Sequence, residues 1–144
     1  MLIKRFRTTL HDYKDLLATA QMQKVDMAEA VSSGKHIYNY NHSKAKYLAD
    51  NMKKNVEELR KLITQLYSHS TNPVLGEQYS RIMINVRLLQ EKYYDPVRSI
   101  PIIEQIERML KPLEQDEFIR QELEEFHAAE KAQQEKAEKE EIES

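Results

Sequence analysis

Two pairs of side chains in this chain are of types that could bind a metal ion. Glu124 and His127 form one Glu-x-x-His motif, the spacing used in di-iron helical bundles, but such sites need two copies of the motif and two further carboxylates. His36 and His42 are six residues apart and would lie on different faces of a helix, so they do not suit a shared metal ion. We therefore predict that the chain has no metal site.

Candidates for catalysis are equally few. Glu104 and Glu107 would share a helix face with Arg108 and Lys111 beside them, an arrangement typical of surface ion pairs rather than of a general acid and base. The chain has no cysteine nucleophile, and its two glycines are too few for a glycine-rich loop that holds phosphate groups. These observations predict a protein that is not an enzyme and needs no cofactor.

The segment 35–44 is rich in tyrosine, histidine and asparagine and has the least helical composition in the first half of the chain. One interpretation is a loop at the tip of a helical hairpin, with Tyr38 closing the end of the core. The other is a recognition surface, because exposed tyrosine gives a large contact area at low entropic cost and, beside lysine, also suits single-stranded nucleic acid. The candidate partner-contact residues are Lys35, His36, Tyr38, Tyr40, His42 and Lys44.

Long helices are predicted to position these residues. Two glycines and four prolines lie between stretches in which an apolar residue recurs every three or four positions. Because a helix interior tolerates Gly and Pro least, this pattern predicts an all-α fold. The first stripe contains Ile3, Phe6, Leu10, Tyr13, Leu17, Ala20, Lys24, Met27 and Val31, and the second contains Ala45, Leu48, Met52, Val56, Leu59, Ile63 and Leu66.

The members of the two stripes lie at nearly equal distances in sequence on either side of a point next to Gly34. If the chain folds back there, Leu10 faces Leu59 and Leu17 faces Met52, which predicts a long antiparallel, coiled-coil-like hairpin over residues 1–68. Further apolar residues beside the stripes require cover from the second half of the chain or from a second copy of it. These residues are Leu16, Met22, Leu62 and Tyr67.

A second, shorter helical hairpin is predicted over residues 75–127. Asp95 is expected to cap a short turn that opens with Pro96, whereas Pro101 suits the first turn of the following helix. Pro112 is expected to bend or end that helix. The first stripe contains Leu75, Tyr79, Ile82, Val86, Leu89 and Tyr93, and the second contains Ile102, Ile106, Met109 and Leu113.

The end of the chain carries little apolar surface. Ile119, Leu123 and Phe126 form a last apolar face, and residues 128–144 contain good helix formers with almost nothing to bury. We predict one helical bundle domain over residues 1–127, followed by a charged tail over 128–144 that is helical or disordered, with a frayed helix favoured.

Charge is unevenly distributed along the chain. Residues 1–113 contain 18 Lys and Arg against 12 Asp and Glu, a net charge of +6, whereas residues 114–144 contain 4 against 12, a net charge of −8. One interpretation is an acidic tail that folds over a basic body at low salt. The other is a tail that screens a basic surface which RNA or DNA would otherwise occupy.

Two short motifs are similar to those of a known family, the small all-helical subunits of type III CRISPR complexes. They are Leu59-Arg60-Lys61-Leu62 and Tyr94-Asp95-Pro96-Val97-Arg98. The family has a glycine before the second arginine, where this chain has Val97, and we assign the chain to no family on this basis. The resemblance implies only a class, a helical subunit lying along a nucleic acid, which we keep as one alternative.

The sequence therefore favours a non-catalytic helical interaction protein, namely an adaptor, a chaperone-like protein or an assembly subunit, that acts through protein–protein contacts and includes homodimerisation among them. The alternative is a nucleic-acid-associated helical subunit, which the net charge of −2 disfavours. A third possibility is membrane-surface binding through the amphipathic start, residues 2–7. The absence of cysteine and of any apolar run long enough to span a bilayer predicts a cytoplasmic protein without a transmembrane segment.

Overall fold

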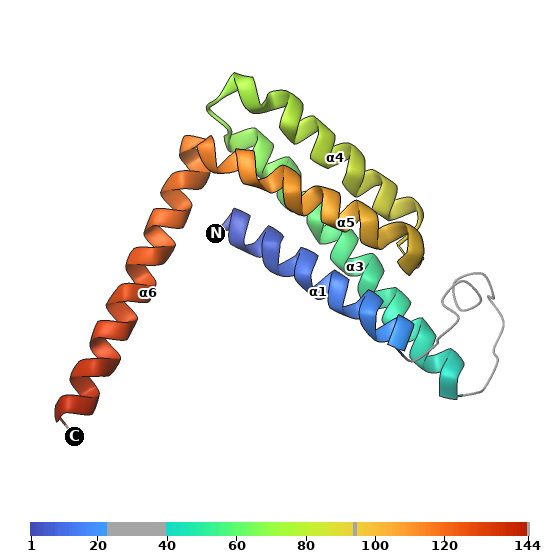
Figure 1. The fold of residues 1–144 in the computed structure, drawn as a ribbon, viewed down its shortest axis with the longest axis horizontal. Coiled ribbons are helices and arrows are strands. Elements are labelled where there is room, and N and C mark those ends of the chain that lie inside the picture. The colour runs from blue at the N-terminus through green and yellow to red at the C-terminus, as the bar shows by residue number, and fades with distance from the viewer. Residues whose placement is uncertain (23–39, 94, 144) are drawn as a thin grey trace.

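The computed structural model describes residues 1–22, 40–93 and 95–143, and its regular structure there is entirely helical, as predicted (Figure 1). Five α-helices and two short 3₁₀ helices make up this part of the chain. They are α1 (Leu2–Met22), α3 (Tyr40–His69), η1 (Pro73–Leu75), α4 (Gly76–Glu91), α5 (Pro96–Leu110), η2 (Lys111–Gln115) and α6 (Glu117–Glu143).

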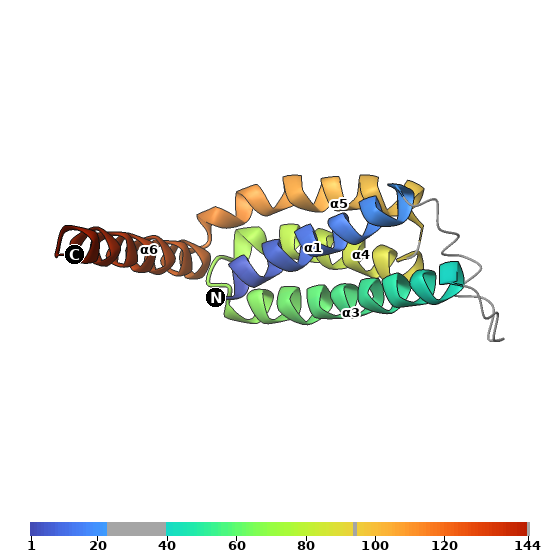
Figure 2. The same cartoon turned by 90° about the horizontal axis from the view of Figure 1, so that it is seen from below.

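Four of the helices form a bundle. α1 contacts α3 and α5, and α4 contacts the same two helices, so each member of the bundle has two neighbours. Figures 1 and 2 show successive helices running in opposite directions along the bundle axis. The contact between α5 and α1 thus closes the bundle. This contact is less extensive than the one between α1 and α3.

The apolar stripes of α1 and α3 form most of the core. Every described member of the two stripes is at most 4% exposed, and Leu62 of α3 is buried as well. Ile3 and Phe6 are fully buried, so the amphipathic start of the chain faces the bundle and does not present its apolar residues to a membrane surface. The last three members of the first stripe, Lys24, Met27 and Val31, and the predicted fold-back beside Gly34 lie outside the described residues.

The predicted stripe of α5 is partly wrong. Ile103 and Leu110 are buried, whereas Ile102 and Met109, which the stripe contained instead, are only partly buried. The hydropathy pattern misses this choice because the buried face of α5 begins with a serine. Ser99 is fully buried and its hydroxyl donates a 2.7 Å hydrogen bond to the carbonyl oxygen of Lys92.

The start of α5 also differs from the prediction. Asp95 caps α5 itself, because its carboxylate accepts hydrogen bonds from the backbone N–H groups of Val97 and Arg98, and Pro96 is the first residue of the helix. Pro101 therefore lies inside α5 rather than in its first turn. Pro112 acts as predicted, because α5 ends at Leu110 and the chain continues as the short helix η2.

α6 leaves the bundle (Figures 1 and 2). It passes the predicted domain boundary at residue 127 without interruption, so the charged tail is helical as far as Glu143. We call residues 117–126 the base of α6 and residues 127–143 the arm. Leu123 and Phe126 of the base are partly buried, whereas every side chain from residue 127 to 141 is exposed.

Candidate interaction site

The base of α6 is attached to the start of α1. The two carboxylate oxygens of Glu122 accept hydrogen bonds from the backbone N–H groups of Leu2 and Ile3, at 3.0 and 3.1 Å. Such N–H groups have no partner within their own helix and carry a partial positive charge, which a carboxylate satisfies. The ammonium group of Lys4 lies 3.1 Å from the centroid of the Phe126 ring, a cation–π contact. These contacts fix the first turns of α6 against α1.

A buried carboxylate determines where α6 begins. Asp116 is fully buried and accepts hydrogen bonds from the Ser70 hydroxyl, the Tyr79 hydroxyl at 3.0 Å and the backbone N–H of Phe118 at 3.1 Å. Burial raises the pKa of Tyr79, and its hydrogen bond to Asp116 raises that pKa further. The Phe118 ring stacks on His69, the last residue of α3. α3, α4 and α6 thus meet at one polar cluster, which sets the direction in which α6 leaves the bundle.

The arm is the part of α6 whose side chains are exposed from residue 127 to residue 141. Its sequence contains six glutamates and three lysines, a net charge of −3 when His127 is neutral. The ring of His127 lies 3.9 Å from Glu130, and both side chains are exposed. A helix without an apolar stripe has no face to bury against a core, in keeping with the position of the arm outside the bundle.

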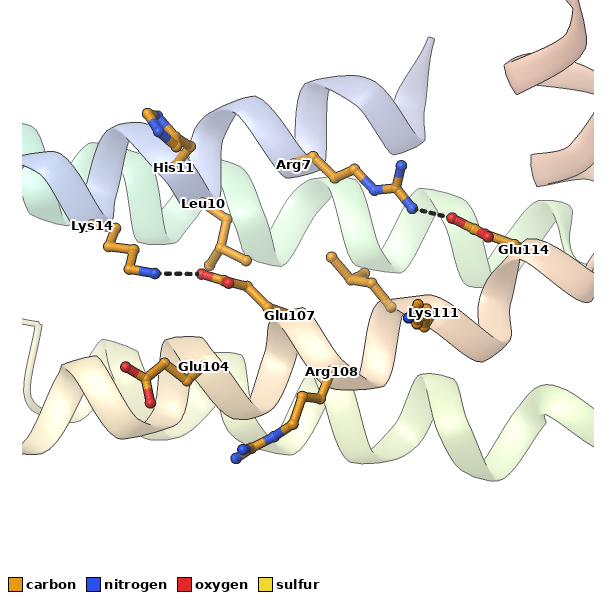
Figure 3. Close-up of a pocket in the computed structure, with 10 residues that line it drawn as sticks. Arg7, Leu10, His11, Lys14, Glu104, Glu107, Arg108, Lys111 and Glu114 are labelled. Atoms are coloured by element: carbon orange, nitrogen blue, oxygen red, sulfur yellow. Dashed lines mark hydrogen bonds and ion pairs between the residues drawn. The ribbon is translucent and has the colours of Figure 1, made fainter.

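A groove lies between α1 and the segment formed by α5 and η2 (Figure 3). It has a volume of about 750 Å³ and an apolar floor that includes Leu10. Arg7 forms a 2.8 Å ion pair with Glu114, and Lys14 forms a 3.2 Å ion pair with Glu107, across the groove from α1. Figure 3 shows Leu10 between these two pairs. The remaining residues that line it are His11, Glu104, Arg108, Leu110 and Lys111.

The groove is open and its charged walls are mostly paired. The pairs join α1 to α5 and η2, so Glu107 acts as an interhelical ion-pair partner, in keeping with the surface role expected from its sequence context. Exposed ion pairs of this kind contribute about 0–1 kcal/mol each to stability. The groove is therefore an open surface feature that two interhelical ion pairs cross.

The predicted tip residues are only partly placed by the structure. Lys35, His36 and Tyr38 lie outside the described residues. Tyr40 and His42 belong to the first turns of α3, and the described structure does not include their side chains. Lys44 is partly exposed on α3. The end of the predicted loop, from Tyr40 onward, is thus helical, because it forms the start of a long amphipathic helix whose packing outweighs local propensity.

The Glu-x-x-His motif lies on the solvent-exposed side of α6. Glu124 is 3.9 Å from Arg120 and His127 is 3.9 Å from Glu130, so each is paired within its own helix. Over the described ranges, no three or more histidine, aspartate or glutamate side chains gather in a way that could hold a metal ion.

Sequence reasoning missed the two carboxylates that position α6. Asp116 precedes the apolar run of α6, which is a recognised cap signal, and this signal could have been read from the sequence. The hydroxyl partners Ser70 and Tyr79 are 46 and 37 residues away, and Glu122 is 120 residues from Leu2. No local pattern predicts contacts of that separation.

Comparison of the chain with protein-family models, with curated proteins and with solved structures finds no match. None of the described helices combines the length and the apolar character that spanning a bilayer requires.

Proposed function

We propose that the protein is a non-catalytic helical interaction protein, an adaptor, chaperone-like protein or assembly subunit, which binds protein partners through the α6 arm and the adjoining groove. One observation carries this proposal: α6 continues past the bundle as far as Glu143, and its side chains are exposed from residue 127 to residue 141. Its base is held by Asp116 and Glu122, so a partner meets an arm of defined direction. Such preorganisation reduces the entropic cost of binding.

The coiled-coil geometry of the first hairpin forms part of the proposal. We propose that α1 and α3 pack so that Leu10 faces Leu59 and Leu17 faces Met52. The burial of both stripes supports this register. The residues of segment 35–44 remain proposed as a second contact surface. We also propose a cytoplasmic location, with which the lack of cysteine is compatible.

A pull-down experiment from a lysate of the native host tests the proposal. The full chain is compared with a chain that ends at Phe126, which retains the described core and the base of α6. We expect the full chain to capture proteins that the shortened chain does not, with unchanged cooperative unfolding of the bundle. Identical captured proteins in both samples, or none, would argue against the arm as the contact element.

Nucleic-acid association is the second candidate function. It is favoured by exposed basic residues on α3, which include Arg60 and Lys61 of the motif that resembles the CRISPR subunits. Asp95 and Pro96 of the other motif already have a local role as the start of α5. A titration with a single-stranded oligonucleotide at low and moderate salt tests this candidate, because phosphate contacts weaken steeply with salt. Absence of salt-sensitive binding would exclude it.

A further inference from the structure

The outer face of α3 carries basic side chains that have no acidic partner in the described part of the chain. Its five exposed bases are Lys46, Lys53, Lys54, Arg60 and Lys61, and we call them the basic face. Lys46, Lys53 and Arg60 follow one another at intervals of seven residues, which keeps them on one side of the helix. The exposed carboxylates of Asp50 and Glu57 share this side of the molecule. Five bases against two acids leave a net charge of +3.

The arm complements the basic face in charge and in length. Its net charge of −3 is equal in size and opposite in sign to that of the basic face. At 1.5 Å per residue, residues 127–143 extend about 25 Å, and the segment from Lys46 to Lys61 extends about 23 Å. The two surfaces are therefore similar in length and opposite in net charge.

The arm does not reach the basic face of its own molecule. Figures 1 and 2 show α6 directed away from α3 beyond its base, so the tail does not fold over the basic body. The hydrogen bonds of Asp116 and Glu122 hold the base in this direction. Contact between the complementary surfaces therefore requires two molecules.

We propose that the arm of one copy docks along the basic face of a second copy. This inference rests on the proposed role of the arm as a contact element and names its partner. The contact is electrostatic, because the arm offers little apolar surface besides alanine. Both surfaces are exposed, so salt weakens the association. A reciprocal exchange of arms would close a two-fold dimer.

Sedimentation equilibrium of the full chain at about 0.02 M and about 0.5 M salt tests the proposal. We expect a mass above the 17.1 kDa of one chain at low salt and a return to that mass at high salt. The variant Lys54→Glu with Lys61→Glu should weaken self-association by about tenfold or more, since like charges then face each other. The variant Glu135→Lys with Glu138→Lys should do the same.

The decisive measurement mixes these two variants. In the mixture, the reversed α3 face of one variant meets the reversed arm of the other, and the two unchanged surfaces also meet. We therefore expect the mixture to recover association that neither variant shows alone. The control is Arg81→Glu with Arg87→Glu, which changes the net charge as much as the Lys54→Glu and Lys61→Glu variant does. Both residues are exposed on α4, outside the arm, the basic face and the groove, so this variant should leave the self-association intact.

Three results would overturn the proposal. They are a single-chain mass at every concentration in low salt, self-association that the reversals do not alter, and a mixture that recovers nothing. Oligonucleotide binding by a single-chain species, lost on Lys54→Glu with Lys61→Glu, would assign the basic face to nucleic acid instead. None of these results bears on capture of other proteins by the arm, which the pull-down measures separately.

Discussion

The buried carboxylate of Asp116 gives the sharpest test of how α6 is positioned. Asp116 is fully buried, caps the start of α6 through the Phe118 N–H and accepts hydrogen bonds from the hydroxyls of Ser70 and Tyr79. Replacement by alanine removes the cap and leaves the Tyr79 hydroxyl buried without its acceptor. We therefore expect Asp116→Ala to destabilise the bundle and to release the base of α6.

The expected magnitude follows from these contacts. Loss of a helix cap costs about 1 kcal/mol, and a buried hydroxyl without a partner costs about 1–3 kcal/mol. The Ser70 hydroxyl is partly buried and contributes less. Removing a buried charge offsets some of this loss. The sum is about 2–4 kcal/mol, which for a chain of this size lowers the melting temperature by about 10 °C.

Urea denaturation followed by far-UV circular dichroism measures this change. Asp116→Asn keeps one carbonyl oxygen for the Phe118 N–H, so it should lose less stability than Asp116→Ala. The matched control is Asn72→Ala, because Asn72 caps the short helix η1 by a similar hydrogen bond to Val74 N–H at an exposed site. If Asp116→Ala costs no more than this control, the carboxylate does not have the buried structural role that we assign to it.

Three further predictions concern other contacts of the bundle. Burial raises the pKa of Tyr13 from 10.0 to about 12. The neutral Tyr13 side chain therefore contributes about 2–3 kcal/mol to the free energy of unfolding below pH 10, and this contribution is lost as the pH rises to about 12. Urea denaturation across this pH range should show the loss, and Tyr13→Phe should reduce the pH dependence. Glu122→Gln should cost about 1–2 kcal/mol and speed hydrogen exchange in the first turn of α1, which NMR would detect, whereas unchanged exchange would contradict the cap. Ile103→Ala should cost about 2–5 kcal/mol in thermal unfolding and Ile102→Ala clearly less, whereas equal losses would contradict the observed orientation of α5.

The helices of the first half could be predicted because hydropathy alone defines their buried faces. Apolar residues recur on each helix at spacings that leave a single apolar side, as Leu10 and Leu17 do on α1 and Leu59 does on α3. Only that side of each helix could be buried. The strong signal of a long periodic stripe also explains why α3 ends at His69, where the apolar pattern stops.

The orientation of α5 could not be predicted in the same way. Ile102 and Ile103 are adjacent, as are Met109 and Leu110, so two apolar stripes one residue apart are available. The bundle buries the stripe that begins at Ser99, and the serine hydroxyl is satisfied there by its hydrogen bond to the Lys92 carbonyl oxygen at the α4–α5 turn. A hydropathy pattern counts that serine as polar and therefore favours the wrong stripe.

The course of α6 depends on a different kind of information, since the arm has almost no apolar surface to define its place. An isolated helix of about 17 residues is marginal in water, because its first turn is costly to form. The base removes that cost, since its residues are already helical and are held by Asp116 and Glu122. The arm needs only to extend an existing helix, for which its alanine, glutamate and lysine residues are well suited. Its helicity should therefore depend on two carboxylates that lie outside it, so a weakened base would disorder the arm without changing any of its own residues.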